Sequence, residues 1–123
     1  MTRTAYLCAP YTAPTDAARR ANIRKALEAG LIMLDQGYFP LVPHASMNHE
    51  TDWETAMCRC EATIRSLDTR TDCLITLDGW QQSAGCKREV ALAVSIGLAV
   101  RTLGPITRKE IDDALCDLRH GPV

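Results

Sequence analysis

Apolar residues in this chain fall into two kinds of segment that alternate along its length. Short continuous apolar runs, which predict buried β-strands, cover residues 4–8, 38–42, 73–77 and 98–103. Segments with apolar positions every three or four residues, which predict helices, cover residues 15–36, 53–67, 83–96 and 107–118. This alternation favours an α/β fold: a doubly wound, flavodoxin- or Rossmann-like, mostly parallel sheet of four to five strands with helices on both faces.

Individual residues refine the arrangement. The first helix is expected to begin at Thr15 or Asp16, whose side chains can cap it, and to end at Gly37. Pro40 lacks the N–H that a central strand needs, so the strand at 38–42 is expected at an edge of the sheet. The run at 73–77 is apolar throughout and predicts an interior strand covered on both faces.

The same architecture predicts where a ligand binds, because ligands of such sheets sit beyond the carboxyl ends of the strands. The segments expected there are residues 9–14, 43–49 and 78–89. Ser83 and Gly85, at the start of the third helix, would offer a hydroxyl and backbone amides to an anion such as a phosphate. Glu89 lies about one and a half turns further on, so its carboxylate can lean back toward the same opening. The alternative is that Ser83 only caps the helix and that Glu89 faces solvent.

Composition narrows the class of ligand. The chain of 123 residues, expected to form one domain over 1–123, carries 14 basic and 15 acidic residues. Its net charge of −1 gives no overall field that would gather nucleic acid or an anionic membrane, so we expect a small-molecule ligand. One basic run in the first helix is interpreted as a solvated face: Arg19, Arg20, Arg24 and Lys25.

Six cysteines raise the questions of disulfides and of metal binding. The first residues lead directly into a strand, without an apolar export signal, so we expect a cytoplasmic protein with reduced thiols. Cys58 and Cys60 could hold zinc together with His44 and His49, but their spacing is not that of a usual zinc motif. No metal site and no cofactor are therefore expected.

Several stretches, taken in order, resemble a known family. They are Tyr6-Leu7-Cys8-Ala9-Pro10, Gly37-Tyr38-Phe39-Pro40, Asp72, and Gly79-Trp80-x-x-Ser83-x-Gly85-x-x-x-Glu89 followed by Ala93 and Gly97. Their order and spacing over residues 4–103 are similar to those of the nucleoside 2-deoxyribosyltransferase-like family, which includes the 2′-deoxynucleoside 5′-phosphate N-hydrolases.

The resemblance implies cleavage or transfer at the N-glycosidic bond of a (deoxy)nucleoside or its 5′-monophosphate, without a cofactor. Glu89 would be the nucleophile that attacks the sugar and forms a covalent glycosyl intermediate. Tyr6 would orient the nucleophile, and Ser83 and Gly85 would hold a 5′-phosphate. The resemblance also implies a homo-oligomer.

The sequence departs from the family in two places. The family takes an acid from the helix before the third strand, but the corresponding residue here is Ile64. This leaves Glu61, Asp72 and Asp78 as candidates for handling the proton of the leaving base. The turn after the first strand carries no arginine, which argues against tight binding of a monophosphate.

Further substrate contacts are expected from the same three segments. Tyr11, Trp53 and Trp80 could stack on a base, and His44 could bond to a base or sugar. Besides Ser83 and Gly85, the expected substrate-binding residues are Cys8, Ala9, Pro10, Tyr11, His44, Gly79 and Trp80.

Three functions remain open at this point. The first is an enzyme acting on nucleosides or nucleotides. The second is a non-catalytic module of the same fold that binds or senses a nucleotide, because loss of a proton donor typically lowers a rate by about 10² to 10⁴. The third is a scaffold for a protein partner, for which the sequence shows no surplus amphipathic surface.

Overall fold

The computed structural model describes residues 3–47 and 51–120. Its strands are β1 (Arg3–Cys8), β2 (Tyr38–Leu41), β3 (Cys73–Leu77) and β4 (Ala99–Leu103). Its helices are α1 (Asp16–Asp35), α2 (Trp53–Arg65), α3 (Ala84–Ser95) and α4 (Arg108–His120). Two short 3₁₀ turns are η1 (Pro43–Ala45) and η2 (Trp80–Gln82).

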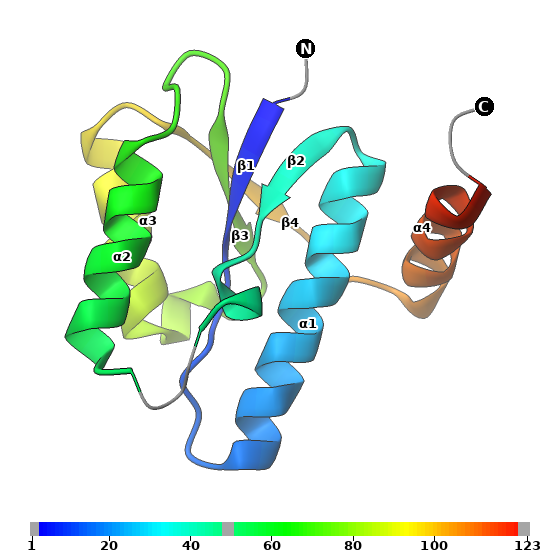
Figure 1. Cartoon of the computed structure of the whole chain (residues 1–123), viewed down its shortest axis with the longest axis horizontal. Coiled ribbons are helices and arrows are strands. Elements are labelled where there is room, and N and C mark those ends of the chain that lie inside the picture. The colour runs from blue at the N-terminus through cyan, green and yellow to red at the C-terminus, as the bar shows by residue number, and fades with distance from the viewer. Residues whose placement is uncertain (1–2, 48–50, 121–123) are drawn as a thin grey trace.

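The strands form one parallel sheet in the order β2-β1-β3-β4. α1 lies over one face of this sheet and α2 and α3 lie over the other, while α4 packs against α1 (Figure 1). The chain runs from β1 outward to β2 and then returns past β1 to β3, so strand order reverses between β1 and β3. This confirms the predicted doubly wound α/β fold, with four strands that are all parallel.

Local signals in the sequence account for several boundaries. The Thr15 hydroxyl accepts a hydrogen bond from the Ala18 N–H at 3.1 Å and so caps α1, as expected. β2, which contains Pro40, is an edge strand, and all five residues of β3 are buried. None of the helices within the described residues is long and apolar enough to span a membrane.

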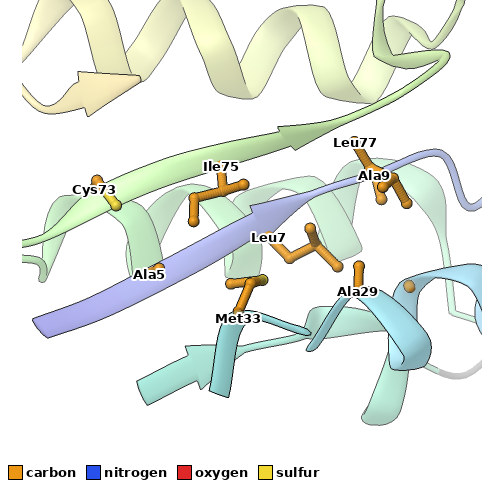
Figure 2. Close-up of a cluster of buried hydrophobic side chains, with 9 residues drawn as sticks. Ala5, Leu7, Ala9, Ala29, Met33, Cys73, Ile75 and Leu77 are labelled. Carbon is orange, nitrogen blue, oxygen red and sulfur yellow. The ribbon is translucent and has the colours of Figure 1, made fainter. Parts of the chain in front are cut away.

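Alternating residues of β1 point to opposite faces of the sheet and join two separate cores. On one face, Leu7 packs with Ile75 of β3 and Met33 of α1 (Figure 2). On the other face, Tyr6 and Cys8 pack with residues of α2 and α3. The pleat of β1 therefore delivers Tyr6 and Cys8 to the α2–α3 side.

The first prediction from the fold concerns Gly30, where α1 crosses β2. A Cβ at this position would lie 2.9 Å from Cγ2 of Val42, closer than carbon atoms pack. Gly30→Ala is therefore expected to lower the free energy of unfolding by about 1 kcal/mol, because overpacking outweighs the gain in helix propensity. Urea denaturation measures the change.

Gly104→Ala is the matched control, since no atom lies within 4 Å of a Cβ built there. Gly30→Ala combined with Val42→Ala should recover helix propensity without the close contact. If Gly30→Ala is as stable as Gly104→Ala, the close approach of α1 to Val42 is contradicted.

Candidate functional site

A cavity of about 1040 Å³ opens at the carboxyl ends of β1 and β2, bounded by α2 and the start of α3. It lies next to the reversal of strand order between β1 and β3, where ligands of this architecture bind. Its volume is at the upper limit for small-molecule sites, which span about 300 to 1,000 Å³. The cavity therefore has room for a nucleotide.

A hydrogen bond between Tyr6 and Glu89 lies in the wall of this cavity. The Tyr6 hydroxyl, from the middle of β1, donates to Oε2 of Glu89, from the second turn of α3. Both residues line the cavity, yet only 1% of Tyr6 and 6% of Glu89 is exposed. The structure thus brings these two sequence-predicted residues together, and Glu89 does not face bulk solvent.

Burial determines the protonation of this pair. Burial raises the pKa of Glu89 to about 7, and hydrogen bonding with Tyr6, Cys8 and Cys60 opposes part of that rise. Burial and the nearby Glu89 carboxylate raise the pKa of Tyr6 far above its ordinary value, so the phenol stays a donor. Glu89 is consequently about half ionised at neutral pH, a state suited to a nucleophile or a general base.

The start of α3 forms another part of the wall. The Ser83 hydroxyl accepts from the Cys86 N–H at 3.2 Å and caps the helix, as the simpler interpretation held. Ser83 and Gly85 nevertheless both line the cavity. A Cβ at Gly85 would lie 3.3 Å from the Met57 sulfur of α2, so glycine lets the two helices approach closely here.

His44 lies on η1, directly after β2, and is 4% exposed. Its Nε2 is 3.0 Å from the Pro10 carbonyl oxygen, which can only accept, so Nε2 carries the hydrogen. Nδ1 is a buried acceptor without a partner among the described residues. Burial lowers the pKa of His44. Its neutral ring packs edge-on against the Tyr11 ring, with 5.7 Å between the two ring centres.

The structure does not place all of the proposed acids in the cavity. Asp72 lies just before β3, at the amino end of the sheet, where its carboxylate accepts from the N–H groups of Thr4 and Asp68. The structure therefore does not bring Asp72 to the cavity, because the amino and carboxyl ends of parallel strands lie at opposite edges. Asp78 is exposed and is not among the described residues that line the cavity.

Glu61 is held outside the cavity by Arg88 of α3. The Arg88 guanidinium is 2.7 Å from the Glu61 carboxylate and 2.8 Å from that of Glu54, and it lies 5.7 Å from the Trp53 ring centre. These contacts tie α2 to α3 on the outer side of the cavity. Glu61 is thereby occupied as an ion-pair partner and, like Asp78, is not a cavity residue of the described chain.

The expected substrate-binding residues divide in a similar way. Ala9, Pro10, Tyr11 and Gly79 line the cavity, as does Trp53. Trp80 instead packs against the core on the α2–α3 side and is not among the described residues that line the cavity. Cys8 is fully buried behind the cavity wall, where its thiol donates to the Cys86 carbonyl oxygen at 3.5 Å.

Several lining residues were not expected from the sequence, and two of them bear on the chemistry of the cavity. Cys60, from α2, is buried in the same cluster as Tyr6 and borders the cavity. Arg19, assigned to a solvated face, lines the cavity from the first turn of α1, and its side chain is 21% exposed and pairs with Asp16 at 2.9 Å. Its place in the first turn, at the carboxyl edge of the sheet, is the signal that could have singled it out.

The zinc set weighed from the sequence is not assembled among the described residues. Cys58 is exposed whereas Cys60 is buried, and His49 lies outside the described residues. All six cysteines are free thiols.

Comparison with known proteins places the chain in a family but gives no activity. No curated protein matches the chain. The family model described as a domain of unknown function (DUF4406) matches residues 4–102, which is most of the chain and includes α1 to α3, the cavity and all but the outermost residues of β1 and β4. The chain therefore belongs to the DUF4406 family.

Proposed function

We propose that this protein cleaves or transfers at the N-glycosidic bond of a (deoxy)nucleoside or nucleoside 5′-monophosphate, with Glu89 as the nucleophile. The observation that carries the proposal is the buried hydrogen bond between Tyr6 and Glu89 in the wall of a nucleotide-sized cavity. The resemblance of residues 4–103 to the nucleoside 2-deoxyribosyltransferase-like family supports it, because that family uses a tyrosine and a glutamate at the matching positions.

In the proposed reaction, a carboxylate oxygen of Glu89 bonds to the anomeric carbon as the bond from that carbon to the base nitrogen breaks. The electron pair leaves with the base, which takes up a proton from solvent. Tyr6 donates to Oε2, which leaves Oε1 for the attack. Water or a second base then displaces the glycosyl ester and regenerates the carboxylate, so the sugar keeps its configuration.

Three groups in the cavity suit a 5′-phosphate on the substrate. The Arg19 guanidinium supplies a positive charge, and the Ser83 O–H is a free donor because its oxygen serves as the helix cap. The first residues of α3, a helix of 12 residues, line the same cavity, and a helix N-terminus favours a negative charge. Arg19 thus supplies the guanidinium that the turn after β1 lacks.

Arg19→Ala is accordingly expected to raise KM for a nucleoside 5′-monophosphate by about 10- to 100-fold, the loss expected for a charge-assisted hydrogen bond. KM for the matching nucleoside should change little. Arg20→Ala is the matched control, because Arg20 is the exposed neighbour and does not line the cavity. Equal effects of Arg19→Ala on nucleotide and nucleoside would remove Arg19 from phosphate binding.

The test of the proposed activity is incubation of the purified protein with a panel of nucleosides and 5′-monophosphates, followed by chromatography for free base. Wild type and Glu28→Gln should release base, since Glu28 is a carboxyl group away from the cavity, whereas Glu89→Ala should not. Release of base at the same rate by Glu89→Ala would exclude Glu89 as the nucleophile.

One observation favours a second function, a nucleotide-sensing module without turnover. Among the described residues that line the cavity, Glu89 is the only carboxyl group, so no second acid is at hand to protonate the leaving base. A thermal-shift screen separates the two functions. A rise in Tm with a nucleotide that is recovered intact after hours supports sensing, and recovery of free base supports the enzyme.

A further inference from the structure

Glu89 is surrounded by sulfur as well as by the Tyr6 hydroxyl. The thiols of Cys8 and Cys86 and the Glu89 carboxylate each place one potential ligand atom within 4.8 Å of the other two, and all three residues are buried. Cys86 and Glu89 are three residues apart on α3 and share one face of the helix. Cys8 meets them from the end of β1.

These three groups are a donor set for a thiophilic metal ion. Zinc prefers thiolate sulfur with nitrogen or carboxylate oxygen in a tetrahedron, with metal–sulfur bonds of about 2.3 Å. Such a tetrahedron separates two sulfur ligands by about 3.8 Å. The spacing of the cluster, at most 4.8 Å, is therefore close to that needed without movement of the backbone.

We propose that Cys8, Cys86 and Glu89 form a binding site for Zn²⁺, which enters through the cavity and occupies the carboxylate of Glu89. Cys86 and Glu89 line the cavity and give the ion access, while Cys8 closes the site from behind. Water from the cavity completes the tetrahedron, because no other Cys, His, Asp or Glu of the described residues joins this cluster.

Binding exchanges protons for metal. Hydrated Zn²⁺ loses part of its water as the Cys8 and Cys86 thiols give up their protons to solvent and form metal–sulfur bonds, and the Glu89 carboxylate donates an oxygen lone pair. No electron is transferred. An oxygen that is bound to zinc cannot attack a sugar, so the ion is an inhibitor rather than a cofactor. This inhibition rests on the proposed function, whereas the binding itself does not.

The test uses Co²⁺ as a spectroscopic substitute for Zn²⁺, added to the full chain in a reductant without thiols. One equivalent should produce a thiolate-to-cobalt charge-transfer band and the strong visible bands of tetrahedral cobalt, and Zn²⁺ should remove both. Cys86→Ser should lose these bands. Cys58→Ser with Cys116→Ser, which removes the exposed thiols, should keep them.

Two further measurements keep the test decisive if Cys86→Ser does not fold. Glu89→Gln retains the side-chain volume and should keep the charge-transfer band but bind Zn²⁺ at least about 10-fold more weakly. Zinc binding should also release protons, measured in weakly buffered solution. The absence of a tetrahedral cobalt spectrum, or its loss only in the Cys58→Ser with Cys116→Ser variant, overturns the site. Zinc binding without any release of base from nucleosides would retain the site and reject the proposed activity.

Discussion

Glu89→Gln is expected to lower the rate of base release by at least about 10³-fold and, at pH 8, to raise the free energy of unfolding by up to about 3 kcal/mol. The rate falls because an amide cannot form the glycosyl ester. Stability rises because the carboxylate, only 6% exposed, is costly to ionise where it lies. The opposite directions of the two effects mark a group retained for chemistry and not for stability.

The pH dependence of the stability change identifies its cause. Below the ordinary Glu pKa of 4.5, Glu89 is neutral in both the folded and unfolded chain, so its ionisation does not lower the free energy of unfolding. Between 4.5 and about 7 only the unfolded chain ionises, so wild-type stability falls as pH rises, and above about 7 the cost is complete. Denaturant titrations at pH 4 and pH 8 measure this. A Glu89→Gln gain that is equal at both pH values would contradict a raised pKa.

The second large effect is on the pH profile of the proposed reaction. The attacking carboxylate must be ionised, so kcat/KM should rise about 50-fold between pH 5 and pH 7 and level off above the Glu89 pKa of about 7. Tyr6→Phe removes a hydrogen bond that lowers this pKa, so its acidic limb should move to higher pH. The loss of activity should therefore be larger at pH 6 than at pH 9.

Tyr38→Phe is the control for the tyrosine substitution, because Tyr38 packs against the core on the opposite face of the sheet. Its profile should coincide with that of wild type. An unchanged acidic limb in Tyr6→Phe would mean that the Tyr6 hydroxyl does not set the protonation of Glu89, whatever its effect on the maximal rate.

The fold could be predicted because each strand and helix carries its own local signal. The unbroken apolar run of β3, the Thr15 cap and Pro40 each led to the observed position. The buried face of α1 could not be predicted in the same way, because the apolar residues of this helix are spread over all of its sides. Leu27 and Leu34 are 45% and 42% exposed, whereas small residues such as Ala29 face the sheet, where the close approach to β2 leaves little room.

The candidate site could be predicted in part, as far as spacing along an element determines direction. Tyr6 and Glu89 were expected together and lie together. Arg19 was missed because a charged run looks solvated until the fold brings its first member to a cavity. Glu61 was misplaced because its orientation depends on an ion pair with Arg88, across the gap between two helices.

The ion pairs of Arg88 that join α3 to α2 also affect how far the site tolerates insertions and deletions in α3. Arg88 and Glu89 are neighbours about 100° apart around one helix, one facing the outer ion pairs and the other the cavity. Ser83 sets the rotation of that helix from its first turn. Inserting one residue between Ser83 and Arg88 would bring Arg88 to the position of Glu89 and replace a negative charge with a positive one, and deleting one would bring Val90 there. The number of residues between Ser83 and Glu89 therefore matters as much to the site as the identity of its acid.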